Sequence, residues 1–451
     1  MNIVIGIAIL LTLMLSDSPF SAENIDVGTR LCGLLLLTVL APFTATVLVL
    51  HTTRTNSDEI TFQQEVLKAR FNSSIHTCIW IISSLAIVLA IGWHDIVRQT
   101  FHLANWIFID EALIIAPMLV SLIVSWAIFF EQHSDSIDRD KRFAAMLQYV
   151  GLRCKVYLLM VLVPIAIVIL LKDLWPMLEQ LSPALAGSMA VLAIVTMLLM
   201  MPMVIRLIWT NRPITDEEGR SALLQVCQNH QLSIQEIRVW DTNHQVINAL
   251  VAGLHPRFRT LMVTDLLLRS FPASELAAVL RHEAGHVNLR HLPTRIGFIL
   301  LPALALFAMD MDPNQSLNVI FSQFGFAEGA ALVMGLIFFA YVVLVTAWLS
   351  RNMEFEADLY AIGALNDRSA GIENPEHAQA MADALLRFAE QNPDQYSRRS
   401  ITHPSLMERI ELIKRSSADP KTARHFQCRF VVHQFMVAFG MLALMAGLLV
   451  I

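Results

Sequence analysis

Two histidines with a glutamate between them are the residues of this chain best suited to chemistry. His282 and His286 are four positions apart in the segment H-E-A-G-H. On a helix, this spacing puts both imidazoles on one face, where they can bind one zinc ion, while Glu283 can reach water at an open position and act as a general base. Because so short a pattern also arises by chance, a surface helix that merely carries two histidines is the alternative reading.

A second pair of residues with helical spacing can complete the metal site. Glu354 and Asp358 are four positions apart in S-R-N-M-E-F-E-A-D. A hydrolytic zinc site needs three protein ligands, so we expect Glu354 to be the third, and Asp358 to accept a hydrogen bond from a ligand imidazole. Glu356 lies on another face of the same helix, and we expect it to be a solvated or structural carboxylate. His291 is predicted to be a peripheral histidine rather than a ligand.

A third motif, T-H-P-S followed by an arginine, adds two candidate residues. Pro404 fits the first turn of a helix, which places His403 at the mouth of that helix. His403 can then either donate to the oxyanion of a tetrahedral intermediate or serve as an N-terminal cap. Arg409 can orient the same site or pair with a surface carboxylate.

The elements around these motifs predict a small α+β domain. Thr215 and Glu218 have the spacing of a capping box and open a helix. Short strands are expected at Ile237–Trp240 and Leu261–Thr264, with a third at residues 246–250. Pro272 precedes the helix that carries the two histidines, whose apolar positions recur at helical intervals.

The composition is that of a membrane protein. Of the 451 residues, 55% are hydrophobic and 16% are charged, whereas about 25% are charged in a typical soluble protein. Segments long and apolar enough to span a bilayer are Leu31–Leu50, His76–Trp93, Glu111–Phe130, Val156–Leu171, Ala184–Trp209, Gly329–Leu349 and Phe430–Ile451, with shorter candidates at Asn2–Ser16 and Ile296–Met309. The first of the shorter ones is expected to be a retained span, since it lacks the basic start of a signal peptide, which is the alternative.

Charge and cysteine content exclude several classes of protein. The net charge of −6 and the absence of a long basic run give no reason to expect nucleic acid as a partner. The five cysteines are scattered and odd in number, so neither a disulfide framework nor a thiolate metal site is predicted. Charged residues within the apolar segments are too sparse for the ion pathway of a transporter.

The loops between the apolar segments alternate between rich and poor in Lys and Arg. The connections at residues 52–74 and 131–155 are basic, whereas those at 94–110, 172–183 and 310–328 are nearly devoid of positive charge. By the positive-inside rule, residues 211–295 and 350–429 are then both cytoplasmic. The predicted division of the chain is a membrane region of about six helices (1–210), two parts of one peptidase domain (211–295 and 350–429), a transmembrane hairpin between those parts (296–349) and a closing helix (430–451).

With these motifs in order, the chain resembles the integral-membrane gluzincin zinc metallopeptidases, which include the HtpX-type heat-shock proteases and the CAAX prenyl endopeptidases. The resemblance covers about residues 215–415 and includes the hydrophobic pair of segments between the first and second motifs. It implies that His282, His286 and Glu354 bind one zinc ion per chain, that Glu283 is the general base, and that His403 and Arg409 belong to the transition-state region. It also implies that Asn248 and Ala249 lie on the edge strand that holds the substrate backbone.

The expected fold is therefore a mainly α membrane protein, a polytopic helical bundle with a small α+β gluzincin-type zinc peptidase domain split by a helical hairpin. The expected function is endopeptidase action on membrane or membrane-adjacent proteins, in a bacterial plasma membrane, with protein substrate and lipid bilayer as partners. A sensor-transducer that cleaves itself and a non-enzymatic metal-binding or transport protein are the alternatives. The amino-terminal region departs from the HtpX pattern, which has two spans there, so the resemblance does not specify a substrate. Nothing in the sequence indicates an oligomeric state.

Overall fold

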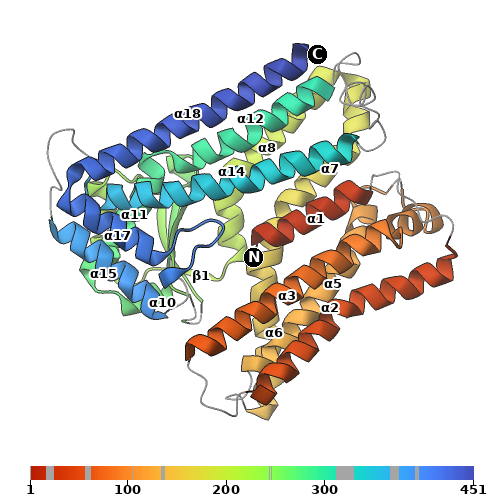
Figure 1. Ribbon diagram of the computed structural model, residues 1–451, viewed down its shortest axis with the longest axis horizontal. Helices are drawn as coiled ribbons and strands as arrows, with labels where there is room; N and C mark the ends of the chain where they lie inside the picture. Colours follow the sequence, from red (N-terminus) through yellow and green to blue (C-terminus); the bar gives the residue numbers. More distant parts are fainter. Residues whose placement is uncertain are drawn as a thin grey trace. The chain divides into compact units, whose positions relative to one another are not determined.

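The computed structural model describes residues 2–16, 25–55, 62–104, 106–133, 138–242, 244, 246–310, 330–365, 375–391 and 396–450. These residues are mainly helical with one small sheet, which confirms the expected fold class (Figure 1). The chain divides into two compact units, Met1–Met197 and Leu198–Ile451. All of the candidate site residues belong to the second unit.

The first unit is a bundle of apolar helices. Its long helices are α1 (Asn2–Ser16), α2 (Val27–Thr55), α3 (Phe62–Leu89), α5 (Ile109–Phe129), α6 (Arg139–Arg153), α7 (Met160–Leu181) and α8 (Pro183–Ile208), which continues into the second unit. Short helical turns lie at Trp93–Asp95 (α4), Ile96–Thr100, Phe130–His133 and Cys154–Leu159. Buried side chains such as Ile9, Trp80 and Trp126 form the core, and the Trp80 indole donates a hydrogen bond to the Met118 carbonyl at 2.9 Å.

Several of these helices are long and apolar enough to cross a membrane. Over the residues described, four single helical stretches qualify: Val27–His51, Ile109–Phe129, Arg139–Leu181 and Lys421–Ala443. Two bent pairs raise the number to six: Ser73–Leu89 with Trp93–Thr100, and Leu185–Met197 with Leu199–Ile208. The first pair bends by 51° near Gly92, whose φ of 61° is left-handed and costs little only for glycine. The length and composition of these helices are those of an integral membrane protein.

Two expectations for the membrane segments need correction. The connection predicted at residues 131–155 is helical from Arg139 onward and runs without a break into α7. The predicted span at His76–Trp93 is not straight, because Gly92 bends it. The turn of the predicted hairpin, residues 311–329, and the last residue of the chain lie outside the described residues.

The second unit contains a four-stranded sheet in the order β1-β2-β4-β3. The strands are β1 (Asn211–Pro213), β2 (Glu236–Trp240), β3 (Ala249–Ala252) and β4 (Thr260–Thr264). Strand β4 pairs with β2 in parallel and with β3 in antiparallel orientation, which leaves β3 at the edge. A short turn at Pro256–Phe258 joins β3 to β4.

The third strand begins later than predicted, and β1 was not predicted at all. Asn248 precedes β3 because its N–H donates to the Thr264 hydroxyl at 3.0 Å and not to a backbone carbonyl. Its own carbonyl still accepts from the Thr264 N–H at 3.0 Å. The segment predicted at residues 246–250 is therefore strand only from Ala249, and it continues to Ala252.

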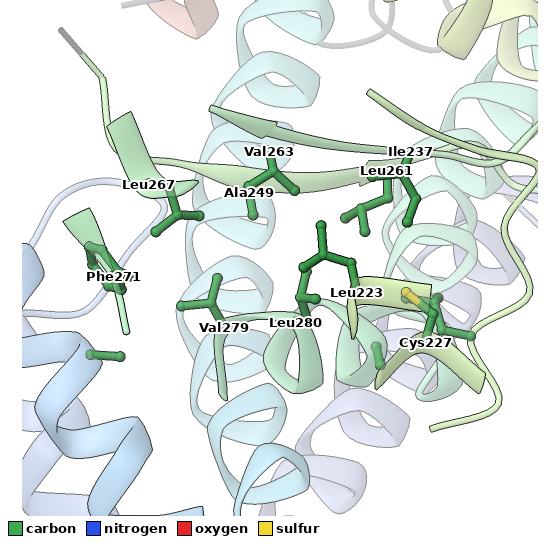
Figure 2. Packing of buried hydrophobic residues seen from close by; sticks show 13 residues of the cluster. Leu223, Cys227, Ile237, Ala249, Leu261, Val263, Leu267, Phe271, Val279 and Leu280 are labelled. Carbon is green, nitrogen blue, oxygen red and sulfur yellow. The ribbon is translucent and has the colours of Figure 1, made fainter. Parts of the chain in front are cut away.

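Helices cover the sheet and join it to the membrane segments. They are α9 (Glu217–Asn229), α10 (Asp265–Ser270), α11 (Ala273–Asn288), α12 (His291–Asp310), α14 (Ala330–Ala361), α15 (Pro375–Gln391), α17 (Leu406–Ala418) and α18 (Pro420–Val450). Figure 2 shows Val279 and Leu280 of α11 facing the sheet residues Ala249, Leu261 and Val263. Helices α12, α14 and α18 run side by side (Figure 1), and α14 passes without interruption from the apolar segment into the second motif.

Helices α11 and α14 are tightly packed at Gly285. A Cβ atom added there would lie 3.1 Å from the Ala357 Cα and 3.2 Å from the Tyr360 side chain. These distances are shorter than ordinary van der Waals contacts, so only glycine allows the two helices to pack at this separation. Because α11 carries the two histidines and α14 carries Glu354, Gly285 sets the distance between the candidate ligands.

We expect Gly285→Ala to lower the midpoint of thermal unfolding. Alanine raises helix propensity by about 1 kcal/mol, but overpacking against the backbone of Ala357 costs about 1–3 kcal/mol. Gly297→Ala in α12 is the matched control, since nothing lies within 4 Å of the added methyl. Thermal unfolding of the two variants in detergent should show a loss for the first and no loss for the second. Equal shifts would contradict this packing.

Candidate metal centre

Three side chains from α11 and α14 converge so that one nitrogen or oxygen atom of each faces a common point. The His282 and His286 Nε2 atoms are 3.2 Å apart, and they lie 3.7 and 3.6 Å from the two carboxylate oxygens of Glu354. These three residues form a group able to hold a metal ion. His282 and Glu354 are buried and His286 is half-buried.

The spacing of this group fits zinc. Nitrogen and oxygen ligands bind zinc at about 2.0–2.2 Å in tetrahedral geometry, which puts any two of them about 3.3–3.6 Å apart. The separations of 3.2, 3.7 and 3.6 Å match that requirement closely. Two imidazoles and one carboxylate leave the fourth tetrahedral position open, as in hydrolytic zinc sites.

A buried arginine and aspartate hold His282 and Glu354 in place. Asp358 Oδ1 lies 2.9 Å from His282 Nδ1, the contact expected for a residue that orients a ligand imidazole. Arg409 donates to both Asp358 oxygens, at 2.8 and 2.7 Å, and its Nη1 lies 3.2 Å from Glu354 Oε2. Arg409 is therefore a buried orienting residue, and the alternative of a surface ion pair is wrong.

These contacts determine the charge of the two carboxylates. Burial alone would raise the pKa of Asp358, but the charge and hydrogen bonds of Arg409 lower it overall. Burial likewise opposes ionisation of Glu354, yet the hydrogen bond from His403 and the charge of Arg409 hold its pKa well below the usual value. Both groups are thus anionic at neutral pH, which is the state that a metal ligand and its supporting residue require.

His286 is held by a different chain of contacts. Its Nδ1 lies 2.7 Å from His291 Nδ1, and His291 Nε2 lies 3.1 Å from Glu356 Oε2. Since Glu356 only accepts, His291 carries its proton on Nε2, and its Nδ1 accepts from the His286 Nδ1–H. The Nε2 lone pair of His286 is then directed at the metal position. Gln427 of α18 donates to the other oxygen of Glu356 at 3.4 Å.

This chain of contacts corrects the expectation for His291 and decides between the two readings of Glu356. His291 is buried against a candidate ligand and is not peripheral, although it is not itself in the ligand group. Glu356 is buried and hydrogen-bonded, so it is structural and not solvated. The sequence signal that was missed is a histidine just beyond the first motif combined with an acid two residues after the third ligand.

We expect His291→Ala to weaken zinc binding by about 10–100-fold, the usual effect of removing a residue that orients a ligand histidine. His255→Ala is the control, because His255 is exposed on the turn after β3 and touches none of the ligands. Competition with a chromophoric chelator measures both affinities. Unchanged zinc affinity in His291→Ala would show that His286 does not depend on this contact.

Glu283 lies beside the ligand group without being part of it. The backbone N–H of Val251, on the edge strand, donates to its carboxylate, and burial raises the pKa of Glu283 to about 7. It lines two cavities, of about 730 and 560 Å³, that meet at the candidate ligands. A half-buried carboxylate with these properties is suited to take up and release protons near neutral pH.

His403 contacts the candidate ligand Glu354 and lines both cavities. Its Nδ1 lies 3.3 Å from Glu354 Oε1, and 60% of the side chain is exposed. Helix α17 is capped by Ser405, whose hydroxyl accepts from the Glu408 N–H at 3.2 Å, while the Glu408 carboxylate accepts from the Ser405 N–H at 3.1 Å. The expected helix start at Pro404 is therefore wrong, and so is the capping role considered for His403.

Asn248 and Ala249, the candidate substrate-binding residues, line the smaller cavity together with His282 and Glu283. Ala249 begins the edge strand β3, and Asn248 directly precedes it. The structure thus brings all nine sequence-predicted site residues to one centre: His282, Glu283, His286, Glu354, Asp358, His403 and Arg409 around the ligand group, and Asn248 and Ala249 on the cavity wall.

A family profile and several known proteins match this chain in sequence. Residues 213–417 match the profile of peptidase family M48. The CAAX prenyl protease 1 homolog of Arabidopsis thaliana is 26% identical over 227 residues, which are 47% of this chain and 50% of that protein. Protease HtpX of Legionella pneumophila (strain Philadelphia 1) is 32% identical over 184 residues, 39% of this chain and 60% of that protein. The chain thus matches about half to three fifths of the length of these relatives.

The fold extends the similarity beyond these motifs. The crystal structure of S. mikatae Ste24p aligns with a TM-score of 0.53 at 16% identity, and the alignment covers 89% of this chain and 98% of that one. At this identity the two proteins are shown to share a fold only. Because the alignment covers 89% of this chain, it includes much of the amino-terminal helical region that departs from the HtpX pattern. The match of residues 213–417 to the profile of peptidase family M48 confirms the resemblance found in the motifs of this segment.

Proposed function

We propose that this protein is a zinc-dependent endopeptidase that hydrolyses peptide bonds of membrane or membrane-adjacent proteins. The observation that carries the proposal is the position of Glu283. It lies next to three residues that fit a zinc ion, and it is hydrogen-bonded to an edge strand that lines the same cavities. The M48 match and the peptidase relatives support the same activity.

In this proposal, the chain supplies a zinc-binding group, a base and a strand to bind the substrate. Zinc held by His282, His286 and Glu354 would lower the pKa of a water molecule and polarise the scissile carbonyl. Glu283 would accept the proton of the attacking water and deliver it to the leaving amine. His403, which is exposed and contacts Glu354, would donate a hydrogen bond to the oxygen on which negative charge develops.

The edge strand suggests how a substrate lies in the site. Among the described residues, strand β3 pairs with β4 on one side only. Apart from the Val251 N–H, which donates to Glu283, the backbone of its other edge can pair with an extended peptide. Leu250 lines both cavities, and Asn248 and Ala249 precede it along one of them. A peptide paired with β3 would therefore pass directly over Glu283.

We place the peptidase segments on the cytoplasmic side of the membrane, a bacterial plasma membrane in this proposal. The alternation of basic and non-basic connections along the chain supports this orientation. The test is a cysteine introduced at the exposed Arg257 in a variant that lacks the five native cysteines. Its labelling in intact cells by a membrane-impermeant thiol reagent would place the site on the outer side instead.

The activity itself is tested with the purified protein in detergent. We expect it to cleave an unfolded reporter protein, to lose this activity with a zinc chelator, and to regain it when zinc is added. A protein that binds zinc tightly but cleaves neither reporter proteins nor itself would be a metal-binding protein, and the proposal would fail. A single self-cleavage product without cleavage of other proteins would favour the sensor-transducer.

A further inference from the structure

The two cavities at the candidate centre form two halves of one cleft. Both are lined by Leu250, Glu283, His286, Glu354 and His403, so these residues lie at the junction. Residues 246–249, which lead into β3, line the smaller cavity only, whereas Val251, Gly253 and Leu254 line only the larger one. An extended peptide on this strand would therefore have one half on each side of Glu283.

The half next to the start of β3 has apolar walls away from the candidate ligands and their partners. Apart from the residues at the junction and their partners, its walls are mainly Ile247, Val279, Met381, Leu385 and Phe388. Met381 and Leu385 of α15 are each only 2% exposed. An apolar substrate side chain buried against these walls would stabilise the complex by roughly 25 cal/mol for each Å² of apolar surface removed from water.

The half next to the end of β3 is basic. Arg259, Arg290 and Arg295 line it, and the only carboxylates on its walls are Glu283 and Glu354 of the catalytic group. Among the described residues, none of the three arginines forms a salt bridge. This half therefore carries three positive charges, of which that of Arg295 is attracted by the Glu354 carboxylate on the same wall.

The individual contacts of these arginines leave their charge available. Arg259 donates only to backbone carbonyls, those of Ser233, Gly253 and Leu254, at 3.0–3.4 Å. Arg295 is half-buried, its Nη2 lies 3.8 Å from the Met353 sulfur, and its Nε has no hydrogen-bond partner in the part of the chain that the structure describes. Arg290 is exposed at the rim.

We propose that this cleft selects peptide segments with an apolar side chain on one side of the scissile bond and a carboxylate on the other. The inference rests on the proposed function and names the substrate class of that site. Guanidinium groups bind carboxylates through paired, charge-assisted hydrogen bonds, and a partly buried pair is screened less by salt than a surface pair. The basic half shares its walls with Glu283 and β3, which favours a peptide carboxylate over a lipid headgroup as the occupant.

The test is peptide binding to the zinc-loaded Glu283→Gln protein in a neutral detergent, where cleavage does not interfere. Four-residue apolar segments are joined to two Glu, two Gln or two Lys residues, in both orders along the chain, and each peptide is labelled for fluorescence anisotropy. In one of the two orders, we expect the Glu peptide to bind about three- to tenfold more tightly than the Gln peptide, and the Lys peptide to bind most weakly. The favoured order assigns the sides of the scissile bond.

Three arginine variants in the same background locate the preference. Arg290→Glu should abolish or reverse the preference for Glu, and Arg295→Gln should reduce it. Arg257→Glu is the matched control, because Arg257 is an exposed arginine two residues from Arg259 that does not line the cleft. If Arg295→Gln does not fold, Arg290→Glu still decides the question, since Arg290 is exposed.

Several results would overturn the inference. One is equal binding of the Glu, Gln and Lys peptides, and another is the same loss of preference in Arg257→Glu as in Arg290→Glu. If anionic phospholipid added to the detergent displaces the Glu peptide while the same amount of zwitterionic phospholipid does not, the basic half is a headgroup site.

Peptides with a free or an amidated C-terminus distinguish a terminal carboxylate from an acidic side chain. Cleavage by the wild-type protein tests the proposed function separately. A binding preference without any cleavage would contradict the peptidase activity but not the preference of the cleft.

Discussion

Replacing Glu283 by Gln should leave zinc bound and reduce peptide hydrolysis by at least about 10²–10⁴-fold, the typical contribution of a general base. The amide keeps the shape of the side chain and can still accept the hydrogen bond from the Val251 N–H. It cannot accept a proton, however, so the attacking water is no longer deprotonated. Zinc content by atomic spectroscopy and the rate of reporter cleavage are measured on the same preparation.

Glu354→Gln is the informative comparison, because it changes a carboxylate of the same size on the other helix. Glu354 lies 3.6–3.7 Å from both histidine nitrogens, so we expect the amide to weaken zinc binding, with activity partly recovered by added zinc. The two variants should therefore fail for different reasons. If Glu283→Gln lost its zinc while Glu354→Gln kept it, the roles assigned to these carboxylates would be wrong.

Arg409→Met should strongly destabilise the domain, by about 3–5 kcal/mol in the free energy of unfolding, because it leaves buried carboxylates without their partner. Arg409 makes two hydrogen bonds to Asp358, which is fully buried, and a 3.2 Å contact with Glu354. Methionine fills most of the space of the arginine stem but provides no charge. Chemical denaturation in detergent, followed by a probe in the peptidase segment, measures the loss.

The double variant Arg409→Met with Asp358→Asn separates charge from packing. If an unpaired anion causes most of the loss, neutralising Asp358 should restore a large part of the stability of the single variant. Arg415→Met is the control on the same helix, since Arg415 forms an exposed pair with Glu411 and should cost little. Equal losses in the double and single variants would show that the arginine acts through packing alone.

The candidate ligands could be predicted because each pair of residues is recognised by its spacing within a single helix. His282 and His286 share a helix face through their spacing, and so do Glu354 and Asp358. Two such pairs, each on a continuous helix, predict one metal centre once the helices are packed together. The small residue that permits this packing, Gly285, was visible in the motif, but its contact with Ala357 depends on the tertiary structure.

The support for His286 could not be predicted in the same way. Arg290 has a φ of 57°, a left-handed conformation that ends the turn after α11 and redirects the chain into α12. This reversal brings His291 back against His286, a contact that helical spacing alone does not indicate. Glu356 joins it from α14, and Gln427 from α18 completes the arrangement.

The sequence patterns also did not predict where α17 begins or which residues line the cleft. The start of α17 is determined by the reciprocal hydrogen bonds of Ser405 and Glu408, which outweigh the preference of Pro404 for a first turn. The basic half of the cleft combines Arg259 just before β4, Arg290 in the turn between α11 and α12, and Arg295 near the start of α12. Because these arginines lie up to 36 positions apart, no local motif predicts that they share a cavity.

The central claim is that His282, His286 and Glu354 hold one zinc ion, and X-ray absorption at the zinc edge of the purified protein tests it most directly. We expect about one zinc ion per chain, surrounded by nitrogen and oxygen only, with scattering from two imidazoles. His286→Ala should lose the scattering of one imidazole or lose the metal. A sulfur ligand in the wild type, or an unchanged zinc content and spectrum in a triple variant with alanine at all three positions, would contradict the account.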